Sequence, residues 1–173
     1  MKASIVLIGP MGSGKSAAGR AVARRLGRPF VEVDEAVEAE AGRSVAEIFA
    51  EEGEGAFRAL EAAAVREAAR IPQAVIACGG GVVLDPDNVV ALRSCGLVLY
   101  LKVSPGAAAR RVGDGKGRPL LSGGKVEARL TEIINERSYL YEGAADRQVD
   151  ADLPLDAVIA AVLEAVPVLG VHP

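Results

Sequence analysis

A chain of 173 residues can bury the core of one globular domain. Half of its residues are hydrophobic and a quarter are charged, which is typical of a soluble protein, and a net charge of −3 argues against broad binding to nucleic acid or to an anionic membrane. The sequence has no bilayer-spanning apolar segment, no signal-peptide pattern and no C-x-x-C motif, so we expect a cytoplasmic protein.

Short apolar runs alternate with helical patterns along the chain. The unbroken apolar run at 3–9 predicts a strand buried on both faces, and 15–27 predicts a helix that Gly27 closes. In chain order, the other expected strands are 29–34, 73–81, 96–103 and 147–150. The other expected helices begin with the capping box of Ser44 and Glu47, at 55, at Asp85-Pro86, at Ser104-Pro105, at 124 and at 155.

This alternation predicts an α/β fold in one domain over residues 1–173, with a parallel sheet covered by helices on both faces. Ligands of such sheets bind at the carboxyl ends of the strands. Three segments depart from the alternation. They are a helical insertion at 33–61, a glycine-rich loop at 113–124 and a tail at 167–173 that we expect to be flexible.

Residues 9–16, GPMGSGKS, match the phosphate-loop pattern G-x-x-x-x-G-K-[ST] between a strand and a helix. Around Gly12, Ser13 and Gly14, backbone N–H groups can surround an anion at the positive end of the helix dipole. Lys15 can reach the β- and γ-phosphates, and the Ser16 hydroxyl can bind Mg²⁺. The motif therefore predicts binding of a nucleoside triphosphate.

The rest of the sequence narrows the class of nucleotide-binding protein. It has no guanine-reading N-K-x-D motif, and it is too short for a large ATPase, which leaves a small kinase. Two alternatives stay open at this point. One is a kinase for a polyol acid such as gluconate or for a nucleoside monophosphate, and the other is a non-catalytic nucleotide-binding module whose lid signals to a partner.

Acids and glycines gather at the expected strand ends. Glu32 and Asp34 are two residues apart, so on a strand both would face the same way, beside the phosphate loop, where a carboxylate can serve Mg²⁺. Gly79, Gly80 and Gly81 follow an apolar run at a cost in backbone entropy, which indicates that a substrate lies against their backbone.

Three arginines are candidates for binding the acidic groups of substrates. Arg58 lies on the helical insertion, Arg118 on the glycine-rich loop and Arg137 in a long helix. Arginine is the preferred fork for carboxylate and phosphate. An arginine on a glycine-rich loop is typical of a lid that closes over a transferring phosphoryl group, so we interpret 113–124 as a lid.

Along nearly its whole length the chain resembles the shikimate kinase family. The resemblance is carried by GPMGSGKS, FVEVD at 30–34, GRSVAEIFAEEGEGAFRALE at 42–61, CGGG at 78–81, GRPLL at 117–121 and ERSYLY at 136–141. It implies a P-loop kinase fold, a three-layer α/β/α sandwich around a five-stranded parallel sheet. It also implies a monomer that transfers the γ-phosphate of ATP, with Mg²⁺, to the 3-hydroxyl of shikimate on the route to chorismate and the aromatic amino acids.

The resemblance assigns roles in the acceptor site. Asp34 is implied to bind the shikimate hydroxyls and to act as base. Arg58 and Arg137 are implied to clamp the carboxylate, and Glu61 to orient Arg58. The backbone of 79–81 is implied to form one wall.

The resemblance also assigns a nucleotide site. Arg118 is implied to act on the transferring phosphoryl group, while Arg111 and Pro154 sandwich adenine. The implied nucleotide contacts are Gly12, Ser13, Gly14, Lys15, Ser16, Ala17, Arg111, Arg118 and Pro154, and the implied metal contacts are Ser16 and Glu32. The chain departs from the family pattern in two places, since the family usually has Asp where Glu32 stands and Thr where Ala17 stands.

Overall fold

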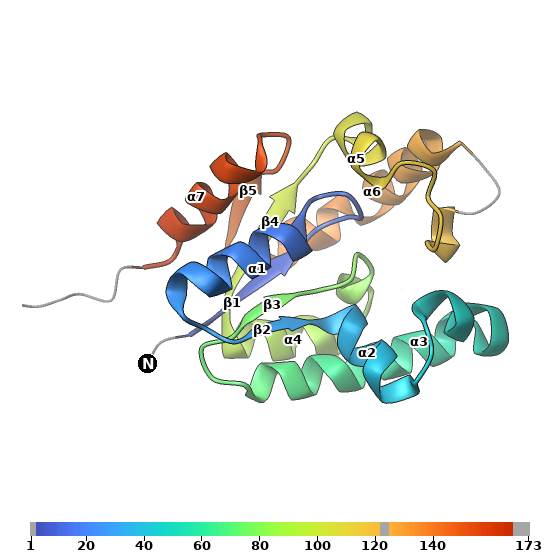
Figure 1. The fold of residues 1–173 in the computed structure, drawn as a ribbon, viewed down its shortest axis with the longest axis horizontal. Helices are drawn as coiled ribbons and strands as arrows, with labels where there is room; N and C mark the ends of the chain where they lie inside the picture. Colours follow the sequence, from blue (N-terminus) through green and yellow to red (C-terminus); the bar gives the residue numbers. More distant parts are fainter. Residues whose placement is uncertain (1–2, 122–124, 168–173) are drawn as a thin grey trace, which may run out of the picture.

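The computed structural model describes residues 3–121 and 125–167, and its strands form one five-stranded parallel sheet (Figure 1). The strands are β1 (Ser4–Ile8), β2 (Phe30–Glu32), β3 (Val75–Ala77), β4 (Gly96–Lys102) and β5 (Arg147–Asp150). Their order is β2-β3-β1-β4-β5. Because β1 is central, the phosphate loop that follows it opens at the middle of the carboxyl edge of the sheet.

Helices cover both faces of this sheet, as the alternating pattern predicts. They are α1 (Lys15–Leu26), α2 (Val33–Ala41), α3 (Val45–Arg70), α4 (Pro86–Cys95), α5 (Pro105–Val112), α6 (Val126–Ala144) and α7 (Leu155–Ala165). Short 3-10 segments lie at Val82–Leu84 and Pro119–Leu121. The expected α/β/α sandwich is therefore confirmed.

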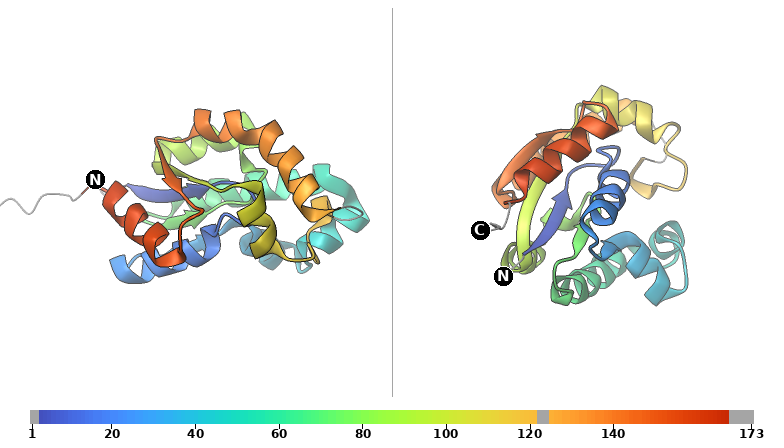
Figure 2. Two further views of the ribbon diagram at one scale, coloured as in Figure 1. Left: turned by 90° about the horizontal axis from the view of Figure 1, so that it is seen from above. Right: turned by 60° about the vertical axis from the view of Figure 1, so that its left-hand side comes forward.

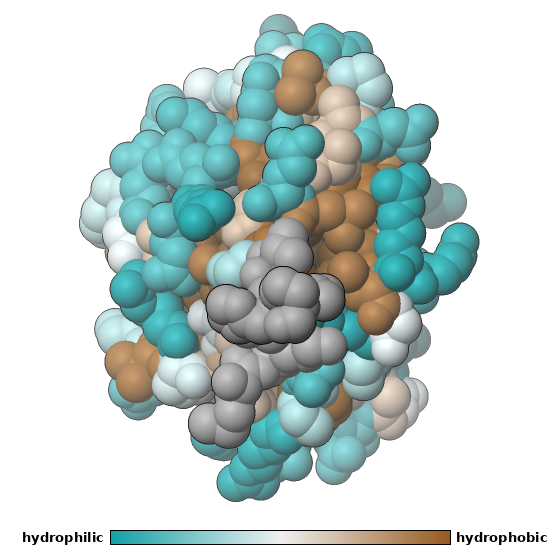
Figure 3. All heavy atoms as spheres, turned by 90° about the vertical axis from the view of Figure 1, so that its left-hand side faces the viewer, coloured by the Kyte–Doolittle hydropathy of each residue, from teal (hydrophilic) through white to brown (hydrophobic). Residues whose placement is uncertain are grey.

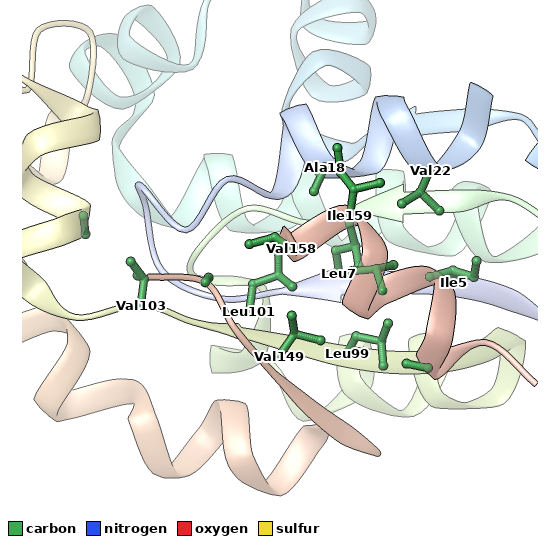
Figure 4. Packing of buried hydrophobic residues seen from close by; sticks show 14 of the residues in the cluster. Ile5, Leu7, Ala18, Val22, Leu99, Leu101, Val103, Val149, Val158 and Ile159 are labelled. Atoms are coloured by element: carbon green, nitrogen blue, oxygen red, sulfur yellow. The ribbon is translucent and has the colours of Figure 1, made fainter. Parts of the chain in front are cut away.

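The core consists of two apolar layers, one on each side of the sheet. All of β1 is buried, and its side chains alternate between the two layers. Ile5 and Leu7 pack with residues of α1 and α7, and Figure 4 shows Val22 and Ile159 above them. On the opposite face, Val6 packs with residues of α3, α4 and the end of α6. Burial on both faces explains the unbroken apolar run.

The expected helix starts are present. Ser44 accepts a hydrogen bond from the Glu47 N–H while the Glu47 carboxylate accepts one from the Ser44 N–H, which is a complete capping box. Asp85 and Ser104 cap α4 and α5 in front of a proline at the first helical turn.

The expected end of the second strand is wrong. The strand predicted at 29–34 ends at Glu32, and Asp34 lies in the first turn of α2, where a carboxylate complements the helix dipole. The period-two argument for Glu32 and Asp34 therefore fails, although both residues remain beside the phosphate loop. The two helices expected from 44 and from 55 are present as the two halves of α3, which a kink at Gly53 separates, where φ is 84° and ψ is 174°.

The strand predicted at 73–81 is also shorter than expected. It ends at Ala77, so 79–81 form a turn that leads into the 3-10 segment. In the segment 113–124, residues 122–124 lie outside the described residues, as do 168–173 of the expected tail.

The carboxyl end of the sheet is where the inserted segments gather. Figure 2 shows α2 and the first half of α3 projecting beyond the sheet on one side, and the loop after α5 on the other. Figure 3 shows the opposite end of the molecule, where hydrophilic side chains cover most of the surface around a group of apolar ones. Among the described helices, none is both long and apolar enough to span a membrane.

Candidate active site

The phosphate loop connects β1 to α1 and holds its lysine inward. The Lys15 ammonium lies 2.7 Å from the Gly9 carbonyl oxygen, 2.9 Å from that of Pro10 and 3.2 Å from the Ser13 hydroxyl. Burial lowers the pKa of Lys15 to about 8, while the nearby Asp34 carboxylate acts in the opposite direction. The ammonium is thus desolvated and in place for an anion that would stabilise its charge.

Close packing explains why one position of the phosphate loop must be glycine. Gly12 has a φ of 77°, and a Cβ there would lie 2.6 Å from the Ala108 carbonyl oxygen of α5. Any side chain would therefore be strained and would clash with backbone. The start of α5 thus supports the loop from behind.

A chain of polar contacts runs from the loop to the end of β2. The Ser16 hydroxyl donates a hydrogen bond to Glu32 Oε1, and Glu32 Oε2 lies 3.1 Å from Arg20. Arg20 also pairs with Glu35 at 2.5 Å and lies over the Phe30 ring. Arg20 is one turn after Ser16 on α1, so the spacing of four residues is the signal that sequence reasoning missed.

These residues bear on how a metal ion would be held. The described residues contain no group of three His, Cys, Asp or Glu that could hold a metal ion. Ser16 and Glu32 nevertheless supply adjacent hard oxygen donors, which suit Mg²⁺, an ion that keeps several waters and takes phosphate oxygens. The residues present therefore fit Mg²⁺ that arrives with a nucleotide.

The acceptor side contains two carboxylates that converge on one glycine. A Cβ built on Gly79 would lie 2.8 Å from Asp34 Oδ1 and 3.1 Å from Glu61 Oε2. Within the described part of the chain, neither oxygen has a hydrogen-bond partner. Burial raises the pKa of Asp34, and the charge of Lys15 acts in the opposite direction. Burial also raises the pKa of Glu61, where the charge of Arg58 acts in the opposite direction.

Two arginines face the same region. Arg58 lies 2.9 Å from Glu61 and 3.1 Å from Glu54. Its guanidinium lies so close to Gly81 that a Cβ built on this glycine would overlap it. Arg137 of α6 is 8% exposed, and its Nε lacks a hydrogen-bond partner among the described residues. Buried polar groups are normally paired, so these unpartnered atoms indicate where a polar ligand would bind.

One cleft of about 830 Å³ joins these groups. It brings together most of the residues that the sequence singled out, namely Gly12, Gly14, Lys15, Ser16, Ala17, Glu32, Asp34, Arg58, Glu61, Gly79, Gly80, Gly81, Arg111, Arg118 and Arg137. Ser13 is buried behind the lysine, and its hydroxyl contacts Lys15.

Of the expected adenine pair, Arg111 lines this cleft, whereas Pro154 is not among the residues that line it. Arg111 donates hydrogen bonds to the Gly12 carbonyl oxygen at 3.1 Å and to the Leu153 carbonyl oxygen at 3.4 Å. Pro154, next to Leu153, is exposed and precedes α7. Arg111 thus connects the phosphate loop to the segment that carries Pro154.

Sequence reasoning missed several cleft residues that are not charged. Met11, Val45, Phe49 and Phe57 line it, and the two phenylalanine rings lie 5.0 Å apart. Phe49 and Phe57 lie on opposite sides of the bend at Gly53, so no helical spacing relates them. Lys116, which is charged, also lines the cleft and adds a second cation to the loop that carries Arg118.

Comparisons with known proteins agree with this arrangement. A family model described as shikimate kinase matches residues 11–167. A shikimate kinase of Caldanaerobacter subterraneus is 44% identical over 94% of this chain and 95% of its own length, and one of Symbiobacterium thermophilum is 47% identical over 93% and 94%.

Solved structures give the same result. A shikimate kinase from Acinetobacter baumannii in complex with shikimate superposes with a TM-score of 0.89 at 31% identity, over 94% of this chain and 89% of that chain. A match to the family model over most of the chain, together with relatives above 40% identity, leads to one conclusion. The chain belongs to the shikimate kinase family.

Proposed function

We propose that this protein transfers the γ-phosphoryl group of ATP to the 3-hydroxyl of shikimate, giving shikimate 3-phosphate for chorismate and aromatic amino acid biosynthesis. The observation that carries the proposal is the convergence of Asp34, Arg58 and Arg137 beside the phosphate loop in one cleft. Shikimate offers one carboxylate and three hydroxyls, which suit two arginine forks and one aspartate.

The nucleotide would occupy the loop side of the cleft. The backbone of 12–14 with Lys15 would surround the phosphates, and Ser16 and Ala17 at the start of α1 would contact them further. Arg111 and Pro154 would enclose adenine. Ala17 has no hydroxyl, so this helix start offers one phosphate contact fewer than the Thr that the family usually has there.

Ser16 and Glu32 would hold Mg²⁺ that enters with ATP, Ser16 through its hydroxyl and Glu32 directly or through water. When bound, the ion would neutralise charge on the β- and γ-phosphates. Glutamate is one methylene longer than the usual aspartate, and Arg20 holds it against Ser16. Arg20 would therefore restrain the carboxylate while the ion enters.

The acceptor would lie between the arginines and the glycine turn. Arg58 and Arg137 would bind its carboxylate, and the backbone of 79–81 would form its wall. Asp34 Oδ1 would accept a hydrogen bond from the reacting hydroxyl. This orientation places the acceptor oxygen toward the phosphate loop, and positioning supplies much of the rate in phosphoryl transfer.

Transfer then needs one new bond and one proton acceptor. The shikimate 3-oxygen bonds to the γ-phosphorus, the bond between that phosphorus and the β,γ-bridging oxygen breaks, and ADP leaves with the electron pair. The hydroxyl proton passes to Asp34. Lys15 and Arg118 neutralise charge on the transferring group.

Several broader properties belong to the same proposal. We infer one kinase domain over 1–173, in which 33–61 receives the acceptor and 113–124 closes as a lid. A monomer is favoured because one chain contributes every proposed contact. A cytoplasmic location is favoured by the free thiols of Cys78 and Cys95 and by a substrate pair, ATP and shikimate, that is metabolic.

The test is ADP release from Mg²⁺-ATP with shikimate, gluconate and nucleoside monophosphates in parallel, with the product identified by phosphorus NMR. We expect release that requires shikimate. Release with gluconate or a nucleotide instead would keep the kinase and reject the roles of Arg58 and Arg137. ATP binding without transfer to any acceptor would favour a non-catalytic module.

A further inference from the structure

Tyr141 of α6 lies directly beneath the glycine turn. Its side chain is fully buried, and its hydroxyl donates a hydrogen bond to the Gly80 carbonyl oxygen. Its ring stacks on Tyr100 of β4, with ring centroids 5.1 Å apart and an interplanar angle of 25°. Stacking and burial leave the ring little freedom, so the packing itself aims the hydroxyl at the turn.

The same hydroxyl also faces Arg137. The two residues are four apart on α6, so they share one face of the helix. Burial raises the pKa of Tyr141 to about 12, and the charge of Arg137 and its hydrogen bond act in the opposite direction. The hydroxyl therefore stays protonated, so it can donate to the Gly80 carbonyl oxygen.

The bond to Gly80 fixes more than one atom. The described chain contains no cis peptide bond, so the Gly80 C=O and the Gly81 N–H point in opposite directions. When Tyr141 holds the carbonyl from the α6 side, the Gly81 N–H is turned away from α6. A Cβ built on Gly81 would overlap the Arg58 guanidinium, so this peptide lies between α6 and Arg58.

We propose that Tyr141 is a positioning residue for the acceptor half of the cleft. Its hydroxyl holds the Gly80–Gly81 peptide one helical turn from Arg137, so that the glycine wall and the arginine fork meet the same acceptor. The inference rests on the proposed function, since it takes this half of the cleft to bind shikimate. A Cβ on Gly80 would lie 3.5 Å from Met11 N of the phosphate loop, so the turn also borders the nucleotide half. We expect the main effect of Tyr141 on the acceptor, because the peptide that its hydroxyl holds forms the wall of the acceptor half.

The test compares Tyr141→Phe with Tyr100→Phe. The first variant keeps the stacked ring and removes only the hydroxyl, which leaves the partly buried Gly80 carbonyl without this donor. We expect its KM for shikimate to rise about tenfold, while its KM for ATP stays within about twofold of wild type. Tyr100→Phe removes the hydroxyl of the other ring in the same stack, and we expect both KM values to stay near wild type.

Calorimetric titration of shikimate into the protein with Mg²⁺-ADP gives a readout independent of turnover, and we expect the same loss of affinity in Tyr141→Phe. An unchanged shikimate KM, an equal rise in both KM values with a lowered Tm, or the same loss in Tyr100→Phe would overturn the inference. If wild-type protein does not phosphorylate shikimate, the proposed function fails and this inference fails with it. The wild-type control therefore tells the two failures apart.

Discussion

Arg58 and Glu61 form an ion pair of 2.9 Å in which the glutamate side chain is 1% exposed. Glu54 pairs with the same guanidinium at 3.1 Å, but its side chain is 48% exposed. Water screens the exposed pair, whereas loss of a buried partner leaves its counterpart poorly compensated. Glu61 is therefore the carboxylate that holds Arg58 toward the cleft, and Glu54 is a natural comparison for it.

We expect Glu61→Gln to raise the KM for shikimate about tenfold, because a neutral amide holds the guanidinium less firmly than a carboxylate does. Glu54→Gln removes a carboxylate from the same arginine at the surface, and we expect a change of about twofold or less. Steady-state kinetics at saturating Mg²⁺-ATP measure both values. Equal effects of the two changes would show that burial does not distinguish the two pairs.

The raised pKa of Glu61 leads to a prediction of how the free energy of unfolding depends on pH. Burial favours the protonated carboxyl, so the pKa of Glu61 in the folded protein is above its ordinary value of 4.5. Its contribution to stability is full below pH 4.5 and is lost as the pH rises through the folded-state pKa. The free energy of unfolding of wild type, relative to Glu61→Gln, should therefore fall as the pH rises above 4.5.

Urea denaturation of both proteins at several pH values measures this difference, in which the other titrating groups cancel. A difference that stays flat with pH, or one that grows as the pH rises, would mean that the Arg58 charge outweighs burial at Glu61.

Substitutions of Glu32 and Glu35 distinguish a role of Glu32 in Mg²⁺ binding from the effect of removing a negative charge beside Arg20. Both pair with Arg20, but only Glu32 accepts the hydrogen bond from Ser16. We expect Glu32→Gln to weaken Mg²⁺ binding to the ADP complex about tenfold, as for residues that orient metal ligands, and Glu35→Gln to leave it near wild type. Calorimetric Mg²⁺ titration of the ADP complex measures this. A similar loss in both variants would assign the effect to Arg20.

The sequence predicted the parts of this fold that local patterns determine. The expected strands overlap all five observed ones, and capping residues such as Ser44 and Ser104 located helix starts. Strand ends were less predictable. Val33 continues the apolar pattern of β2 and is buried, yet it begins α2, because burial is common to both elements and does not tell them apart.

The site was predictable where one short segment contains all the residues that the chemistry needs. The phosphate loop was recognisable because the motif needs its own strand and helix. The convergence of Asp34 and Glu61 on Gly79 was not predictable from local patterns, since three separate elements create it only after folding. Tyr141 was hidden for a related reason, because a buried tyrosine on a helix is ordinary core until its hydroxyl partner is known.

Substitution of Arg118, on the loop that we propose to act as a lid, tests the chemical step. We expect Arg118→Ala to lower kcat by about 10²- to 10³-fold, because its charge would stabilise the transferring group, and to leave the KM for shikimate little changed. Lys125, an exposed lysine at the start of α6, is the matched control, and Lys125→Ala should retain kcat. If the loss in Arg118→Ala is confined to the KM for ATP, the arginine binds the ground state only.

The two neighbouring glycines Gly79 and Gly80 test the acceptor geometry most directly. Neither has a positive φ, so alanine is compatible with both backbones. A Cβ on Gly79 would lie 2.8 Å from Asp34 Oδ1 and 3.1 Å from Glu61 Oε2, so both carboxylates would have to move. A Cβ on Gly80 would have its nearest neighbour at 3.5 Å, which is an ordinary contact.

We therefore expect Gly79→Ala to lower kcat/KM for shikimate by about 10²-fold, since displacement of a positioning group by about 1 Å has that effect. Gly80→Ala should lose far less. Binding of Mg²⁺-ADP, followed by calorimetry, should be alike in both variants, because a Cβ on Gly80 would meet the phosphate loop only at ordinary contact distances, 3.5 Å from Met11 N and 3.6 Å from the Gly9 carbonyl oxygen. If Gly80→Ala were the more damaged protein, the acceptor would lie against Gly80, and Asp34 would not be the residue that orients its hydroxyl.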